Sequence, residues 1–156
     1  MKPAPRVVTI GETFSATLAL SVESVKSFAA LVNDFNPLHH DADYAAQSRF
    51  GGLIASGTQP TAHFMALLAT HFSTYAQPLG LEFDIKLKKA VHANDTLTFT
   101  WRVRDAYWKA SLNGDLTHLD GTTVNQRGEV MLIGASTILV MPKPDSVDSQ
   151  TGVVSS

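Results

Sequence analysis

The chain has 156 residues, of which 44% are hydrophobic and 17% charged, and its formal net charge is −2. This balance predicts a single globular domain with a real core, and it excludes the strongly basic field that recruits nucleic acid or an anionic membrane. The absence of cysteine excludes disulfides, thiolate nucleophiles and cysteine metal ligands. No apolar run is long enough to cross a membrane and the start lacks a signal-peptide core, so we expect a cytoplasmic protein.

The pattern in the first half of the chain is mainly helical. After an expected strand over residues 6–18, apolar residues at helical spacing predict a helix over 21–33. Pro37 ends that pattern because the residue before a proline avoids the α region, and one more helical turn is expected over 43–48.

A second, longer helix is predicted over residues 58–74. Phe64, Leu68 and Phe72 fall on one stripe, and few charges interrupt the segment. We therefore expect this helix to be central and largely buried.

The second half of the chain changes to the two-residue period of strands. Over 81–88, apolar residues alternate with charged ones, which predicts a half-buried strand with one wet face. Lys86, Lys88 and Lys89 are candidates for meeting a phosphate, but alternating lysines on a wet strand face are usually solvated. Three further strands are expected near 96–104, 107–119 and 122–140, with a bulge or bend at Gly128 or Gly134. Helices followed by antiparallel strands indicate an α+β fold occupying residues 1–141, and residues 142–156 have the composition of a flexible tail.

The segment DFNPLHHD, residues 34–41, places an unusual number of polar groups beside the expected end of the first helix. Asp34 and His39 flank Asn36 and Pro37, a spacing that allows a carboxylate and an imidazole to converge on one water and move its protons. The simpler interpretation from spacing alone is that Asp34 caps the turn and His39 is an exposed loop residue.

The segment IASG, residues 54–57, precedes the long helix. A backbone N–H at a helix start is polarised by the helix dipole, so the Gly57 N–H is a candidate donor to a carbonyl oxygen that gains negative charge. Ser56 is a candidate for holding Asp34 or the substrate through its hydroxyl. An ordinary Ser-Gly helix cap is the alternative.

Other kinds of chemistry lack their sequence patterns. Neighbouring histidines at 39 and 40 point to opposite sides of an extended segment and no recognised metal-ligand spacing is present, so we predict no metal. The G-x-S-x-G elbow of hydrolases, the G-x-G-x-x-G motif and the P-loop are also missing from the sequence, so we predict no bound cofactor.

The segment DFNPLHHD resembles the D-x-N-P-x-H-x-D pattern of the MaoC-like dehydratases, which include the (R)-specific enoyl-CoA hydratases. FGGLIASG before a long apolar helix is similar to that family, as are the order and approximate length of the later strand segments, so the resemblance spans roughly residues 7–141. It implies a single hot-dog domain, in which an antiparallel sheet wraps around a central helix.

The resemblance also implies an activity in fatty acid metabolism: addition of water to a trans-2-enoyl-CoA to give a (R)-3-hydroxyacyl-CoA, or the reverse. Carried over by motif, Asp34 and His39 are the catalytic pair and the Gly57 N–H polarises the thioester carbonyl. Asn36 orients the loop and Ser56 lines the site. The family likeness further implies a homodimer or a higher homo-oligomer, and a dimer would protect a sheet edge.

Three alternatives remain open at this stage. In the first, the enzyme acts on a different acyl thioester, which is either bound to acyl carrier protein or a branched dicarboxylic acyl-CoA. In the second, the chain is a thioesterase on the same fold. In the third, it is a hot-dog protein that binds acyl-CoA without catalysis, which the presence of both Asp34 and His39 disfavours.

Overall fold

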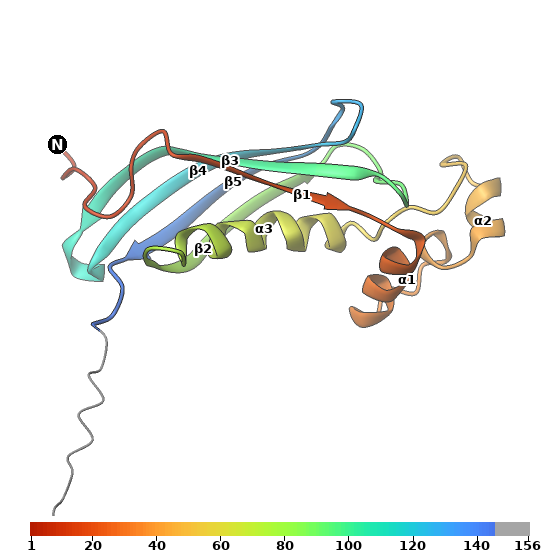
Figure 1. The fold of residues 1–156 in the computed structure, drawn as a ribbon, viewed down its shortest axis with the longest axis horizontal. Coiled ribbons are helices and arrows are strands. Elements are labelled where there is room, and N and C mark those ends of the chain that lie inside the picture. Colours follow the sequence, from red (N-terminus) through yellow and green to blue (C-terminus); the bar gives the residue numbers. More distant parts are fainter. Residues whose placement is uncertain (146–156) are drawn as a thin grey trace, which may run out of the picture.

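The computed structural model describes residues 1–145, which form one antiparallel sheet and a set of helices (Figure 1). The sheet has five strands in the order β1-β3-β4-β5-β2, and every neighbouring pair is antiparallel. The elements are β1 (Thr13–Ala19), α1 (Val22–Leu31), η1 (Pro37–His39), α2 (Ala42–Gln47), α3 (Thr58–Phe72), β2 (Gln77–Leu87), β3 (Thr96–Lys109), η2 (Ala110–Leu112), β4 (Gly114–Val124) and β5 (Val130–Met141). The α+β prediction is confirmed.

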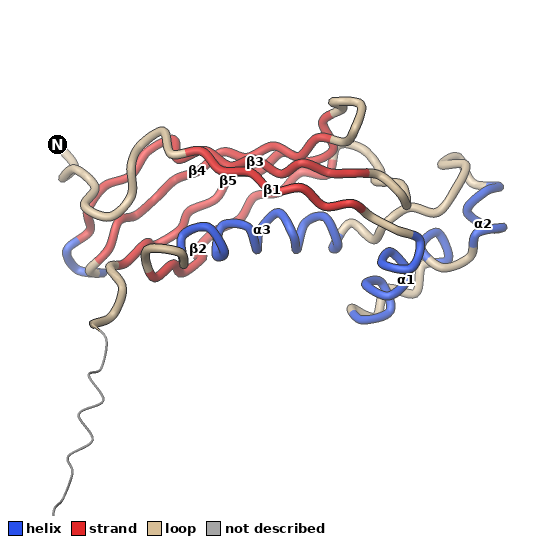
Figure 2. The backbone as a smooth tube through the Cα atoms, viewed as in Figure 1, coloured by secondary structure: helices blue, strands red, loops and turns tan. Residues whose placement is uncertain are grey.

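Helix α3 lies along one face of the curved sheet, whereas α1 and α2 lie together beyond the end at which α3 begins (Figure 2). Phe64, Leu68 and Phe72 are buried, as their spacing predicts, and they pack with the sheet residues of the main core. The prediction that the whole helix is largely buried is wrong, because Ala62 and His63 on its other side are exposed in the single chain.

Two glycines make room for the largest aromatic pair in the core. Gly121 in β4 pairs directly with Gly134 in β5, and a Cβ at either position would come within 3.0 Å of both Trp101 and Phe64. The two rings stack with centroids 4.2 Å apart, and the indole N–H of Trp101 donates to the Phe64 carbonyl at 2.8 Å. Gly134 therefore serves close packing, and the predicted bulge at this position is wrong.

Two strand boundaries differ from those predicted. Strand β3 continues to Lys109, and the chain then turns at Asn113, whose φ of 49° is left-handed, so the strand predicted over 107–119 is divided between β3 and β4. Gly128, with a φ of 77°, lies in the tight turn before β5 and is not a strand bulge. An Asn-Gly pair at 113–114 is a recognised hairpin signal that would have placed the first turn correctly.

The first strand begins later than expected because the segment before it binds a buried carboxylate. Backbone N–H groups of Arg6, Val7 and Val8 donate to the Asp115 side chain at 2.6–3.1 Å, and Asp115 is fully buried. Residues 6–8 are therefore held at the start of β4, and β1 begins only at Thr13.

Strand β2 forms one edge of the sheet and is exposed over most of its length. Its apolar side chains Leu79, Leu81, Phe83 and Leu87 are all solvent-accessible in the single chain, so the predicted half-buried strand is wrong for the protomer alone. None of the helices between residues 1 and 145 is long and apolar enough to cross a membrane. From residue 146 onward, the predicted tail lies outside the described residues.

Candidate active site

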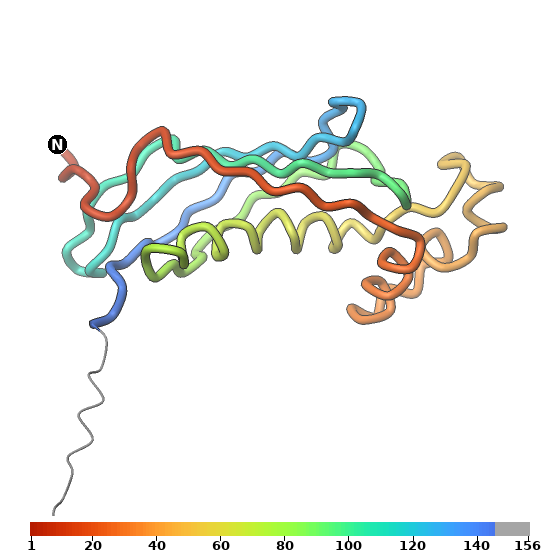
Figure 3. The backbone as a smooth tube through the Cα atoms, viewed as in Figure 1, coloured from red at the N-terminus to blue at the C-terminus, as the bar shows by residue number. Residues whose placement is uncertain are grey.

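Residues 20–57 leave the sheet after β1 and return to it at the start of α3, which places the DFNPLHHD segment at one end of the molecule (Figure 3). Helix α1 ends where Asn33 adopts a left-handed φ of 60° and the Asp34 N–H bonds back to the Ala29 carbonyl at 2.8 Å. Pro37 then starts the short helix η1, and the Asn36 side chain accepts from the Leu38 N–H. Asn36 therefore shapes the loop, as its proposed role requires.

The loop brings Asp34 and His39 together. His39 Nε2 lies 3.2 Å from Asp34 Oδ2, and His39 is only 5% exposed. The alternative of an exposed loop histidine is thus contradicted. Asp34 Oδ1 also accepts from the Asn36 N–H at 3.2 Å, so the carboxylate caps the turn with one oxygen and faces the histidine with the other.

The orientation of the His39 ring is set by a carbonyl group. His39 Nδ1 lies 2.7 Å from the Ile54 carbonyl oxygen, which can only accept a hydrogen bond, so Nδ1 carries the proton. In the neutral ring, Nε2 then keeps its lone pair and faces Asp34. Ile54 belongs to the IASG segment, so this hydrogen bond joins the two motifs.

The environment of Asp34 favours its ionised form. Hydrogen bonding by the Ser56 hydroxyl lowers the pKa of Asp34 most, burial opposes it, and the Asn36 N–H and the charges of His39 and His40 lower it further. Ser56 is buried, and its hydroxyl lies 2.7 Å from that of Thr58. Ser56 therefore influences the ionisation of the Asp34 carboxylate.

His40 is not among the five predicted site residues, but it contributes to the geometry of the loop. Its Nε2 lies 2.7 Å from the Asp34 carbonyl oxygen, and its ring stacks near Phe35. Since a carbonyl accepts only, Nε2 donates this bond and holds the backbone of the residue that carries the carboxylate. The sequence signal for this contact is the pair of adjacent histidines, but their spacing alone does not show which ring faces the backbone.

Gly57 precedes the first turn of α3 with a helical φ of −57°. Within residues 1–145 its N–H has no hydrogen-bond acceptor, as is usual for the first groups of a helix. The helix dipole adds partial positive charge at this end. A Cβ at position 57 would lie 2.5 Å from Leu87 Cδ2, so the absence of a side chain lets Leu87 pack directly over the glycine.

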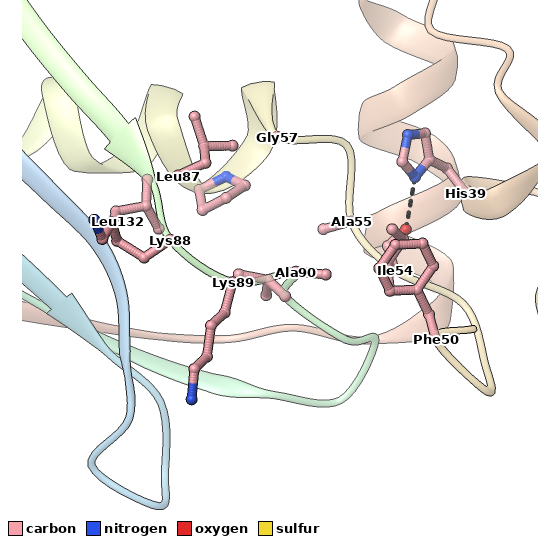
Figure 4. A pocket seen from close by; sticks show the side chains of 12 residues that line it. His39, Phe50, Ile54, Ala55, Gly57, Leu87, Lys88, Lys89, Ala90 and Leu132 are labelled. Carbon is pink, nitrogen blue, oxygen red and sulfur yellow. Dashed lines mark hydrogen bonds between the residues drawn. The ribbon is translucent and has the colours of Figure 1, made fainter. Parts of the chain in front are cut away.

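His39 and Gly57 line the same cavity, whose volume is about 290 Å³ (Figure 4). Its remaining walls are mainly apolar: Ile54 and Ala55 of the IASG segment, Pro60 of α3, Leu87 at the end of β2, Val91 in the segment after β2, and Leu132 of β5. Lys88 and Lys89 also line it. A mainly apolar cavity with one imidazole and one free N–H suits an apolar ligand that carries a single polarisable group.

All five site residues predicted from the sequence therefore lie in or next to one site. His39 and Gly57 line the cavity, Asp34 contacts His39, Ser56 lowers the pKa of Asp34, and Asn36 holds the turn. Over residues 1–145, no three His, Asp or Glu side chains gather closely enough to hold a metal ion. A carboxylate beside an imidazole can move protons, and a free helix N-terminal N–H can donate to a carbonyl group.

The chain is similar to several known proteins. It shares 27% identity with the MaoC-like dehydratase from Rhodospirillum rubrum, with a TM-score of 0.75 over 88% of this chain and 95% of that one. The unliganded R-hydratase PhaJ1 from Pseudomonas aeruginosa gives a TM-score of 0.74 at 24% identity, covering 87% of this chain and 84% of the other. These likenesses confirm the hot-dog fold.

A curated relative matches a shorter part of the chain. The mitochondrial 3-hydroxyacyl-[acyl-carrier-protein] dehydratase from Arabidopsis thaliana is 27% identical over 66 residues, which are 42% of this chain and 40% of the relative's length. The family description "MaoC like domain" matches residues 6–121, a span that holds the loop, α3 and the strands up to β4. The chain therefore belongs to the MaoC-like dehydratase family of hydro-lyases.

Proposed function

We propose that this chain adds water to a trans-2-enoyl-CoA to give a (R)-3-hydroxyacyl-CoA, and catalyses the reverse dehydration, as a step of fatty acid metabolism. The observation that carries the proposal is the contact between His39 Nε2 and Asp34 Oδ2 beside a cavity that Gly57 also lines. The membership in a dehydratase family supports the same chemistry.

The resting geometry of the pair suits a bound water. In its neutral form, with the proton on Nδ1, His39 presents a lone pair on Nε2, only 3.2 Å from a carboxylate oxygen. Two acceptors this close repel each other, and a water that donates one hydrogen to each satisfies both. The oxygen of that water is then held with its own lone pairs free to attack.

In the addition, the water oxygen forms a bond to C3 of the enoyl group while His39 Nε2 takes one of its protons. The electrons of the double bond move toward the thioester carbonyl, where the Gly57 N–H stabilises the negative charge that develops on oxygen. The imidazolium, stabilised by ionised Asp34, then returns a proton to C2. In this scheme His39 is the base and the acid in turn, and Asp34 orients and stabilises it.

The test is hydration of crotonyl-CoA, followed by the loss of absorbance of the conjugated thioester. We expect Asp34→Asn and His39→Gln to lower kcat by about two to four orders of magnitude, since each removes an acid–base group or its partner. His118→Gln is a control, because its ring bonds the Thr137 hydroxyl on a different part of the sheet. Near-normal turnover by either site variant would refute the assignment.

The same assay separates the competing functions. Hydration consumes the double bond and releases no thiol, a thioesterase releases thiol, and a binding protein leaves both intact. An acyl-carrier-protein substrate is favoured by the Arabidopsis relative. A branched dicarboxylic acyl group would need a cation in the mainly apolar cavity, whose two lysines lie in the short segment after β2. A panel of enoyl thioesters of each kind decides among them.

We further propose that the chain works as a homodimer that pairs through β2. This edge strand has unpaired backbone groups on one side and carries four exposed apolar side chains. Leu81→Lys is expected to shift the mass measured by light scattering toward the monomer. Leu112→Lys is the matched control, because Leu112 is 41% exposed, close to the 45% of Leu81, but lies in the β3–β4 turn. Equal masses for the parent protein and Leu81→Lys would reject this interface.

A further inference from the structure

A basic rim lies next to the catalytic cavity. A second hollow, of about 410 Å³, adjoins the cavity and shares Phe50, Lys88, Lys89 and Ala90 with it. We call its four cationic residues the basic rim: Arg49, Lys88, Lys89 and Arg127. The two lysines, which follow β2, therefore border both the cavity and the hollow.

The rim concentrates positive charge on a chain that is negative overall. It holds four of the 12 lysines and arginines, and Glu129 is the one carboxylate among the residues that line the hollow. The local formal charge is thus +3, against −2 for the whole chain. Such a concentration beside a cavity raises the local concentration of anionic ligands.

Glu129 arranges two of these cations side by side. Its carboxylate accepts from Lys89 Nζ at 2.7 Å and from Arg127 Nε at 2.6 Å, and the Asn125 side chain fixes it from a third direction at 3.1 Å. Lysine and arginine carry three and five donors, so most of their N–H groups remain available to an anion. The arrangement holds both side chains in place before any ligand arrives.

The other two cations are not neutralised. In the part of the chain that the structure describes, no carboxylate pairs with Lys88 or Arg49. Arg49 instead lies over the Phe50 ring, with its guanidinium carbon 5.2 Å from the ring centroid. Phe50 lines both the cavity and the hollow and is drawn in Figure 4 near His39, so Arg49 is held at the border between them.

We propose that the basic rim binds the phosphate of the phosphopantetheine arm that carries the acyl thioester. The inference rests on the proposed function: with the acyl group in the apolar cavity and the thioester at Gly57, the arm leaves past Phe50 and its phosphate reaches the rim. Arginine and lysine bind phosphate through charge-assisted hydrogen bonds. Coenzyme A and acyl carrier protein both present such a phosphate, so the rim recognises the feature common to both carriers.

The test uses a variant that removes the two unpaired cations, Arg49→Gln/Lys88→Gln. Its matched control, Lys86→Gln/Arg104→Gln, removes the same charge from two residues outside the rim that are paired with Asp84 and Asp120. We compare kcat/KM for crotonyl-CoA, crotonyl-acyl carrier protein and crotonyl-N-acetylcysteamine, which is a thioester without phosphate. Binding of desulfo-coenzyme A is measured in parallel by calorimetry, so that affinity is known without turnover.

We expect the rim variant to lose at least about tenfold more kcat/KM with a phosphate-bearing carrier than with crotonyl-N-acetylcysteamine, mainly through KM, and the control pair to show no such difference. A loss of kcat/KM that is seen only with crotonyl-CoA, or only with crotonyl-acyl carrier protein, identifies the carrier. Equal losses on all three thioesters, or no loss on either carrier, would overturn the proposal.

Failure of the hydratase proposal has a separate signature. If the parent protein hydrates none of the thioesters, the calorimetric arm still decides: weaker binding of desulfo-coenzyme A by the rim variant alone supports the rim. Unchanged binding, or no binding by the parent protein, rejects it. If instead turnover is normal in the parent protein, the rim variant and its control, the hydratase proposal is retained and the proposal for the basic rim is rejected.

Discussion

The most direct test of the site geometry is a single methyl group at Gly57. An alanine Cβ there would lie 2.5 Å from Leu87 Cδ2 and 4.0 Å from Leu87 Cγ, and among residues 1–145 no other atom outside its two neighbours in the chain comes within 4 Å. Leu87 is 57% exposed, so its end can rotate away. The φ of −57° suits alanine, although alanine is less favoured than glycine at the N-cap position of a helix. The melting temperature should therefore change by no more than about 4 °C.

Activity should respond differently. In the proposed mechanism the methyl group would obstruct the approach of the thioester carbonyl to the Gly57 N–H, and loss of one such donor costs about 10²–10³ in kcat. Because Gly57→Ala keeps the N–H and only obstructs the approach, we expect a loss of about 10–100-fold in kcat with crotonyl-CoA. The double variant Gly57→Ala/Leu87→Ala should recover part of that loss, since Leu87 is the only contact that the methyl group violates. Full activity in Gly57→Ala would show that the carbonyl does not approach this glycine, and a large fall in melting temperature would show that Leu87 cannot move.

Three other substitutions test the packing of the core, the buried carboxylate of Asp115 and the environment of Asp34. Gly121→Ala should lower the free energy of unfolding in urea by about 1–3 kcal/mol, because its Cβ would meet Trp101 at 2.5 Å in the closed core. Asp115→Asn should cost about 1.5–3 kcal/mol in the same measurement, since a buried carboxylate there binds three backbone N–H groups; an unchanged urea midpoint would contradict this. Ser56→Ala should raise the pKa of Asp34, followed by NMR of its carboxyl carbon, because the hydroxyl is the largest cause of its lowering. The acid limb of the pH profile of kcat/KM should then move to higher pH. A limb that stays in place would show that the ionisation of Asp34 does not control turnover.

The elements that sequence patterns placed well are those fixed by local chemistry. The apolar stripe of α3, the proline that ends the pattern of α1 and the two-residue period of the strands each depend on residues close together in the chain. The same holds for the DFNPLHHD loop, where Asn36 and Asp34 make their turn contacts within two residues. Such features could be predicted because no distant part of the fold is needed to form them.

The features that were missed depend on distant segments or on backbone atoms. The tautomer of His39 is set by the Ile54 carbonyl, 15 residues away, and carbonyl groups leave no trace in a pattern of side chains. Asp115 holds residues more than 100 positions earlier. The lysine at 88 was assigned to a solvated strand face because alternation shows that a side chain points outward, but not that a cavity opens beside it.

The exposed edge strand links the proposed assembly to the proposed site. Leu87 ends β2, packs over Gly57 and is followed directly by the two lysines of the basic rim, so the wall of the cavity and the rim both continue from the strand proposed to pair in the dimer. Pairing of β2 with a second copy would fix the backbone of Leu87 and reduce the freedom of its side chain. The alternation of apolar and charged residues over 81–88 then has a physical reason that the single chain does not supply: its apolar positions are half of an interface. A variant that dissociates the dimer should accordingly also raise KM, even though Leu81 itself does not line the cavity.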